Sequence, residues 1–189
     1  APRGPGWRCR TASPHPDASP RPACGSVPGM QPDGVPPDQF RQALSVWASG
    51  VTVVTAAGPE GPVGITVSSF SSLSLDPPLV LVCIARRAQS HDHLVAAPGF
   101  AVHLLSEDQA DTSTLFARPG AEKFDEVTWA PGAFDAPLLH AGTARLVCAR
   151  HAALDGGDHT ILVGRVVDTQ QGDAPPLVYW GRDYRSLNV

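Results

Sequence analysis

Tight turns between strand-like segments constrain the fold of this chain more than any other feature. Segments 51–57 and 63–75 are rich in β-branched residues and flank a Gly-Pro-Glu-Gly turn. Segments 144–154 and 160–169 flank an Asp-Gly-Gly-Asp turn, whose composition favours a β-hairpin. Strands that follow one another through such turns, with only short helices between them, favour an antiparallel barrel over a doubly wound sheet. The sequence therefore predicts a mainly β (α+β) fold.

The remaining predicted elements are shorter. Asp76-Pro77-Pro78 should interrupt the strand ladder, because proline supplies no N–H donor. The apolar run that follows, 79–84, predicts a strand buried on both faces. Two more strands are expected over 100–105 and 177–180, and segment 119–139 is expected to be rich in loops. Helices are predicted from a cap at Asp38 to Gly50, from a cap at Ser90 to Ala97, and from Glu107 to Ala117.

Residues 1–37 differ in composition from the rest of the chain. They are dense in Pro, Gly, Arg, Ser and Ala and show almost no apolar periodicity, so they cannot bury enough surface to offset the entropy of ordering. We expect a disordered tail over 1–37 and one folded domain over 38–189. Met30 is the only methionine, from which we hypothesise that natural translation starts there. The tail lacks the apolar segment of a secretory signal peptide.

Charge and cysteine content argue against several classes of protein. The formal net charge is -4, so the chain has no basic field for a phosphate backbone, and nucleic acid is not an expected partner. No segment approaches the roughly 20 apolar residues of a membrane span, so no membrane association is expected. The four cysteines, Cys9, Cys24, Cys83 and Cys148, form no CxxC pair. We expect the last two to be buried free thiols, in keeping with a reducing cytoplasm.

Several common catalytic and metal-binding motifs are missing. The sequence has no GxGxxG after a strand, no Walker A loop, no GxSxG elbow and no HExxH motif. His91 and His93 are close in sequence, but in a helix-like stretch their side chains diverge, so no metal site is expected there.

Hydroxyl groups are concentrated in one strand-like run, 66–72, which reads Thr-Val-Ser-Ser-Phe-Ser-Ser. Such a run is typical of an edge strand whose hydroxyls face water. It is equally typical of a ligand cradle, in which hydroxyls and backbone N–H groups bind a phosphate or the edge of a flavin ring. Composition alone does not separate the two interpretations.

A family resemblance favours the second interpretation. In chain order the sequence contains GVTVVTA, GITVSSFSSLSLDPPLVLVCI, Ser90, FAVHLL, FARPGAEKF and GDHTILVGRV. This pattern resembles the short-chain flavin reductases that serve two-component flavin-dependent monooxygenases, and the match covers about Phe40 to Tyr184. The resemblance implies the FMN-binding fold of that family, an antiparallel Greek-key split β-barrel with a few short helices, and a homodimer. One departure is His103, where family members commonly have asparagine.

The resemblance also implies which residues bind the cofactors. Residues expected along the flavin ring and ribityl chain are Gly64, Thr66, Ser68 and Ser69, with the backbones of Cys83, Ile84 and Ala85. Residues expected at the flavin phosphate are Arg86, Arg87, Ser90 and His91. A third segment approaches the flavin through Phe116, Ala117 and Lys123, and the nicotinamide side is assigned to His159 and Tyr184.

The implied reaction is hydride transfer from C4 of NADH or NADPH to N5 of FMN or FAD. Because the cofactors supply the difficult chemistry, no catalytic residue is expected in the protein. Reduced flavin would then pass to a separate monooxygenase. Two alternatives remain at this point: a non-catalytic flavin-binding module, and a structural subunit of an oxygenase complex. A split-barrel oxidase acting on a phosphorylated pyridoxine-type substrate is less favoured, because lysine is scarce.

Overall fold

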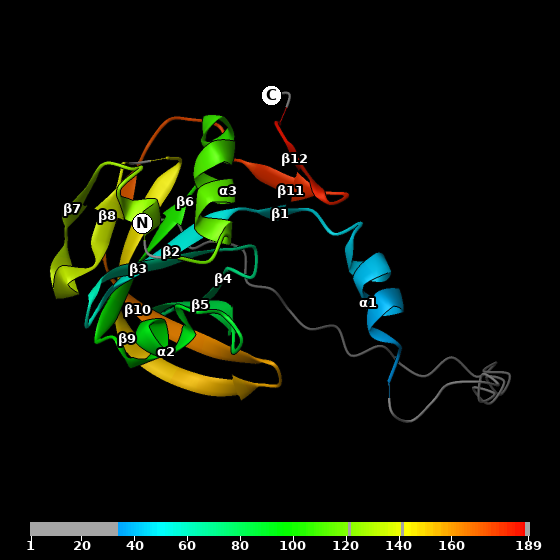
Figure 1. The fold of residues 1–189 in the computed structure, drawn as a ribbon, viewed down its shortest axis with the longest axis horizontal. Helices are drawn as coiled ribbons and strands as arrows, with labels where there is room; N and C mark the ends of the chain where they lie inside the picture. Colours follow the sequence, from blue (N-terminus) through cyan, green and yellow to red (C-terminus); the bar gives the residue numbers. More distant parts are fainter. Residues whose placement is uncertain (1–33, 121, 141, 188–189) are drawn as a thin grey trace, which may run out of the picture. The chain divides into compact units, whose positions relative to one another are not determined.

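A seven-stranded antiparallel sheet is the largest element of the fold (Figure 1). The computed structural model describes residues 34–120, 122–140 and 142–187. Almost all of the predicted tail over 1–37, including Met30, lies outside the described residues. The strand order is β3-β2-β6-β9-β10-β5-β4. These strands are β2 (Thr52–Gly58), β3 (Gly61–Val67), β4 (Ser71–Leu75), β5 (Pro78–Ala85), β6 (Gly99–Leu104), β9 (Ala144–Gly156) and β10 (His159–Gln171).

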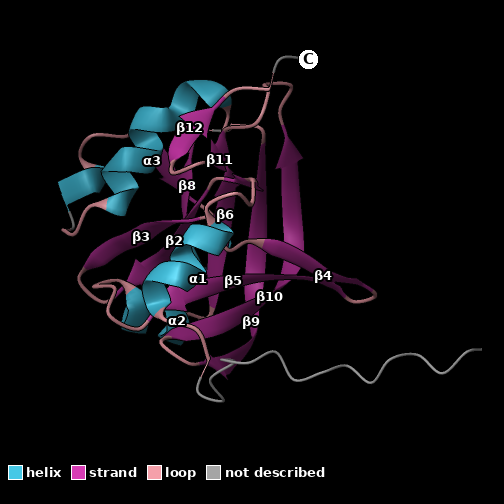
Figure 2. Ribbon diagram, turned by 90° about the vertical axis from the view of Figure 1, so that its right-hand side faces the viewer, coloured by secondary structure: helices cyan, strands magenta, loops and turns pink. Residues whose placement is uncertain are grey.

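Short elements surround this sheet. Both α2 and α3 pack against β2 and β3, and Figures 1 and 2 show the two helices toward opposite ends of that hairpin. The helices are α1 (Pro37–Leu44), α2 (His91–Ala96) and α3 (Ala110–Ala117), with 3-10 turns η1 (Glu107–Gln109), η2 (Glu122–Phe124) and η3 (Ala133–Asp135). One small sheet contains β1 (Ser49–Gly50), β11 (Val178–Trp180) and β12 (Asp183–Arg185). A second small sheet contains β7 (Trp129–Pro131) and β8 (Pro137–Leu139).

Turn chemistry predicted both long hairpins correctly. Gly58 pairs with Gly61 at the end of the β2–β3 hairpin. Gly156 pairs with His159 at the end of the β9–β10 hairpin. The intervening Gly157 has a φ of +76°, a conformation that glycine adopts without a steric cost.

The prediction of one continuous strand over 63–75 was wrong. Strand β3 ends at Val67 and pairs with β2, whereas β4 begins at Ser71 and pairs with β5, at the other end of the strand order. The Ser69 hydroxyl explains the break, because its Oγ lies 3.0 Å from both the backbone N and the backbone O of Cys83 in β5. A side chain thus satisfies backbone groups of β5 where strand pairing is interrupted. Residues 68–70 thereby connect the two edge strands, as in a barrel.

The burial of strand β5 differs from the prediction. Strand β5 alternates, with Val80, Val82 and Ile84 buried and the intervening residues only half-buried, so its expected burial on both faces was wrong. Strands β2 and β6 are the ones buried on both faces along most of their length. Val54 belongs to the core cluster inside the barrel, and Val53 belongs to a second cluster that includes α3.

The helix predicted from Ser90 to Ala97 was correct in place and extent, whereas the other two helix predictions were correct only in place. The first helix ends at Leu44 rather than near Gly50, because Ser49 and Gly50 pair with β11. Its apolar residues stay exposed, and no residue of α1 is buried. Segment 107–117 is divided into η1 and α3, and segment 119–139 contains the β7–β8 hairpin beside its loops. Among the described residues, no helix has the length and apolar character that crossing a membrane requires.

His103 has a structural role. It is 1% exposed, its Nδ1 lies 3.1 Å from the Val53 carbonyl oxygen, and its Nε2 accepts a 3.0 Å hydrogen bond from the Leu139 N–H. Only a neutral imidazole with the proton on Nδ1 makes both bonds. Burial lowers the pKa of His103 to about 4. This side chain joins β2 to β8 and does not line the cleft described below.

His103 therefore predicts an acid-sensitive stability. Between pH 6.5 and pH 4 the unfolded chain binds a proton at this position that the folded chain does not, so the free energy of unfolding falls as the pH drops. Once the pH is below 4, His103 has lowered the free energy of unfolding by about 3 kcal/mol in total. Urea titrations at several pH values should show a shallower fall for His103→Asn than for the wild type. The exposed His151, replaced by Gln, is the control. An unchanged pH dependence in His103→Asn would contradict this role.

Candidate functional site

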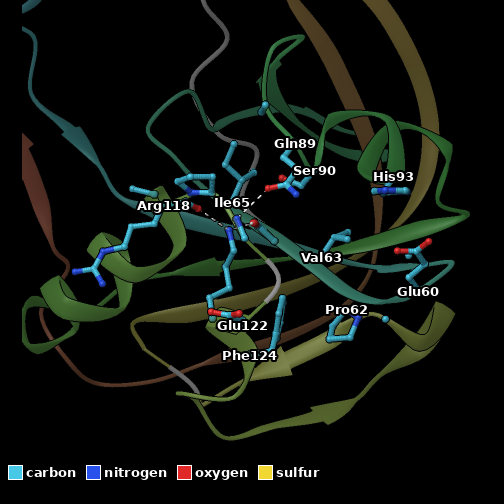
Figure 3. A pocket seen from close by; sticks show the side chains of 18 of the residues that line it. Glu60, Pro62, Val63, Ile65, Gln89, Ser90, His93, Arg118, Glu122 and Phe124 are labelled. Atoms are coloured by element: carbon cyan, nitrogen blue, oxygen red, sulfur yellow. Dashed lines mark hydrogen bonds between the residues drawn. The ribbon is translucent and has the colours of Figure 1, made fainter.

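A cleft of about 750 Å³ lies beside the β2–β3 hairpin (Figure 3). It is lined by the hairpin itself over 58–65, by Ala85 and the loop 87–90, by His93 of α2, and by η2 and the residues on either side of it. Figure 3 shows the side chains of Gln89, Ser90 and His93 on one side of the cleft and those of Glu122 and Phe124 on another, with Ile65 and Val63 between them. A volume of this size accommodates a small-molecule cofactor.

Gly64 brings β3 close to two aromatic rings at the base of this cleft. A Cβ atom at Gly64 would lie 2.8 Å from Phe116 and 3.2 Å from Phe124, so only glycine allows the observed packing. The two rings meet edge to face, with centroids 5.1 Å apart and an interplanar angle of 87°. This end of the cleft is therefore apolar and closely packed.

Lys123 lies at the same end and is buried. Its Nζ donates hydrogen bonds to the carbonyl oxygens of Gly64 at 3.0 Å and Arg118 at 2.9 Å, and it stands 5.7 Å from the centroid of the Phe116 ring. Loss of hydration on burial lowers the pKa of the Lys123 ammonium group. Lys123 thus connects β3 to the segment that follows α3.

Polar groups at the β5–α2 connection are available to a ligand. Ser90 occupies the N-cap position of α2, but its side chain makes no capping hydrogen bond. Arg87 is exposed and belongs to none of the ion pairs found in the described part of the chain. Gln89 accepts a 2.9 Å hydrogen bond from the Gly120 N–H, which joins this loop to the one across the cleft. A hydroxyl and a guanidinium are suitable partners for a phosphate.

The structure brings six of the predicted site residues together. The cleft is lined by Gly64, Ala85, Arg87, Ser90, Ala117 and Lys123. The remaining predicted residues do not line it.

Several of these hydroxyl and imidazole groups are used within the fold. Thr66 donates a 2.6 Å hydrogen bond to the Ser113 carbonyl oxygen, which attaches β3 to α3. Ser69 bonds Cys83 as described above, Ser68 is exposed, and Ile84 lies in the barrel core. His91 is buried, with its Nε2 2.8 Å from Thr160 Oγ1 in β10. Phe116 lies beneath Gly64.

Arg86 and the predicted residues from the β9–β10 turn and the C-terminal segment also have protein partners. Arg86 forms a 2.6 Å ion pair with Asp155 and bonds the Gly157 carbonyl oxygen. His159 Nδ1 lies 2.7 Å from Asp158, and this hydrogen bond lowers the pKa of the Asp158 carboxyl group. Tyr184 lies with its hydroxyl 2.8 Å from Ser113 Oγ in α3.

Sequence reasoning missed part of the lining. The unpredicted residues are 58–63 of the hairpin, Ile65, Ala88, Gln89, His93, 118–120, Glu122, Phe124 and Asp125. The segment FARPGAEKF, which carries part of the family resemblance, contains several of them, so the whole segment could have been predicted to line the cleft. Nothing in the sequence indicated that the end of the β2–β3 hairpin lines a cleft, because its Gly and Pro residues are typical of any turn. No group of three or more His, Cys, Asp or Glu side chains suited to a metal ion occurs in 34–120, 122–140 and 142–187.

The chain belongs to the flavin reductase-like domain family, whose family model matches residues 44–188. It is 45% identical over 150 residues to the FMN reductase (NADH) SmoA of Agrobacterium fabrum, covering 79% of this chain and 86% of the relative. It is 40% identical over 142 residues to the reductase component of 4-nitrophenol 4-monooxygenase/4-nitrocatechol 2-monooxygenase of Rhodococcus opacus, covering 75% and 76%.

A solved structure supports the same assignment. The NADH:FAD oxidoreductase SgcE6 of Streptomyces globisporus C-1027, in complex with NAD and FAD fragments, has a TM-score of 0.74 and 39% identity, covering 78% of this chain and 90% of that one. The predicted fold class is therefore confirmed.

The packing at Gly64 predicts that a methyl group is not tolerated there. Gly64→Ala should lower the free energy of unfolding by about 1–3 kcal/mol, because Phe116 and Phe124 must move. Urea denaturation measures this change. Gly50→Ala, whose added Cβ meets no atom within 4 Å, is the matched control. If both variants were equally stable, the close packing at the base of the cleft would be disproved.

Proposed function

We propose that this protein transfers hydride from NADH to a flavin, FMN or FAD, bound in the cleft. The observation that supports this most strongly is the match to NADH-dependent flavin reductases together with a cleft of cofactor size whose polar lining is available. The structural alternatives, a binding module and an oxygenase subunit without turnover, have no observation that favours them.

The lining of the cleft suits a flavin. An isoalloxazine ring needs an apolar surface, which Ile65, Val63 and Phe124 supply. A flavin phosphate needs donors and positive charge, and Arg87 and Ser90 supply both from one loop. We assign flavin contacts to the six lining residues named above and a supporting role to Thr66 and Ser69, whose hydroxyls hold β3 and β5.

The bound flavin supplies the acceptor for two electrons and a proton. The chain itself holds the ring in place at Gly64 and excludes water from the apolar end of the cleft. For the nicotinamide we propose the side next to His159, because His159 pairs in register with Ala85, which lines the cleft. No side chain needs to act as a nucleophile or a general base.

We further propose that reduced flavin leaves the cleft and serves a separate monooxygenase in the cytoplasm. Relatives named as reductase components of monooxygenases support the first part. Cys83 and Cys148 form no disulfide, which is consistent with a reducing compartment.

Initial rates with two nicotinamides and three flavins test this function. NADH oxidation should require added FMN, FAD or riboflavin, and should exceed the rate with NADPH. Arg87→Gln should raise the KM for FMN about tenfold by removing a charge-assisted bond, while the KM for riboflavin, which has no phosphate, should not change. A wild-type enzyme that binds flavin but does not oxidise NADH would favour the non-catalytic module. Equal effects of Arg87→Gln on FMN and riboflavin would contradict the phosphate assignment.

We propose that the protein is a homodimer that covers the outer surface of β4 and β5. Leu73 and Leu75 are 50% and 95% exposed on β4. Leu79 and Leu81 on the adjacent strand are only half-buried. Apolar side chains grouped in this way are typical of a protein interface.

The dimer proposal predicts that a charge on this surface separates the subunits. Leu75→Glu should shift the protein from dimer to monomer in light scattering coupled to gel filtration, because a carboxylate would be buried without a partner. Leu75→Met keeps the apolar surface and should remain dimeric. A wild-type monomer at micromolar concentration would refute the proposal.

A further inference from the structure

A buried positive charge in the cleft has no carboxylate partner. Lys123 is 9% exposed, lines the cleft, and takes part in none of the ion pairs found among the residues that the structure describes. Lysine is rarely buried to this extent unless an opposite charge accompanies it. The lowered pKa of its ammonium group has the direction expected when hydration is lost and no negative charge is gained. The cleft thus contains a positive charge that an anionic ligand would compensate.

The hydrogen bonds of Lys123 leave room for such a ligand. An ammonium group has three N–H donors, and the carbonyl oxygens of Gly64 and Arg118 accept two of them. Both acceptors are neutral, so they replace lost water without neutralising the charge. Because Lys123 lines the cleft and only two of its donors are used within the protein, we expect the third donor to reach an acceptor on a bound molecule.

The surroundings of Lys123 indicate which part of a flavin it faces. Its ammonium group is bonded to Gly64 and lies beside the Phe116 ring, at the apolar end of the cleft. The proposed phosphate contacts, Arg87 and Ser90, come from the β5–α2 connection instead. The flavin ring, rather than the phosphate, therefore belongs next to Lys123.

We propose that Lys123 stabilises the reduced, anionic flavin ring more than the oxidised ring. This inference rests on the function proposed above. Hydride transfer breaks the C4–H bond of NADH and forms an N5–H bond on the flavin. The electron pair moves with the hydrogen, so NAD⁺ is released and the reduced ring gains one negative charge, spread over N1 and O2. A fixed positive charge in a water-poor site therefore binds the product of this step more strongly than the reactant.

Anaerobic binding titrations of oxidised and dithionite-reduced flavin, with FMN and with riboflavin, test this role. Lys123→Met should weaken binding of the reduced flavin about tenfold more than binding of the oxidised flavin, because a hydrogen bond to a charged group is lost. That ratio corresponds to a fall of about 30 mV in the two-electron midpoint potential of the bound flavin. The change should be the same for both flavins. Lys123→Arg keeps the charge and should retain most of the preference for the reduced flavin.

Two controls separate charge from structure. Arg165→Gln removes an exposed positive charge on β10, outside the cleft, and should leave the potential unchanged. Lys123→Gln removes the charge but keeps N–H donors for the Gly64 or Arg118 carbonyl. If Lys123→Met does not fold, Lys123→Gln is used to compare the binding of oxidised and reduced flavin.

Two results would overturn the proposal. Equal weakening of oxidised and reduced flavin would mean that Lys123 only attaches β3 to the following segment. Weakening confined to FMN would mean that it binds the phosphate. If the wild-type protein bound neither flavin in either state, the proposed function itself would fail, which is a distinguishable outcome.

Discussion

The contact between β3 and the segment that follows α3 determines the shape of the cleft. At Gly64 the backbone touches Phe116 and Phe124, and its carbonyl oxygen accepts a hydrogen bond from Lys123. Thr66, two residues further along β3, is bonded to the backbone of α3. These contacts attach one wall of the cleft to the second core cluster, which contains Phe116 and Phe124.

Binding and electrostatics, rather than a catalytic constellation, are what this cleft offers. Its polar groups divide between a loop with Arg87 and Ser90 and a buried ammonium group at the apolar end. Hydride transfer between two cofactors needs alignment and a favourable field, so a site without a nucleophile or general base is chemically sufficient.

The sequence predicted the local features of the fold and missed those that depend on distant contacts. Both long hairpins followed from their turn residues. The division of segment 63–75 did not, because it depends on the hydrogen bonds between Ser69 and Cys83, 14 residues away. In the site, the resemblance identified Gly64 and Lys123, whereas Gln89 was missed because its partner Gly120 lies in another loop. The His91 prediction placed its side chain at the phosphate, but the structure directs it toward Thr160, a contact that local sequence does not reveal.

A crystal structure of the protein with FMN would show directly where the flavin binds. We expect the isoalloxazine ring in the cleft beside Gly64 and Lys123, with the phosphate at Arg87 and Ser90. A flavin bound elsewhere, for example in the smaller cavity lined by Gln109, Thr112 and His140, would contradict this expectation.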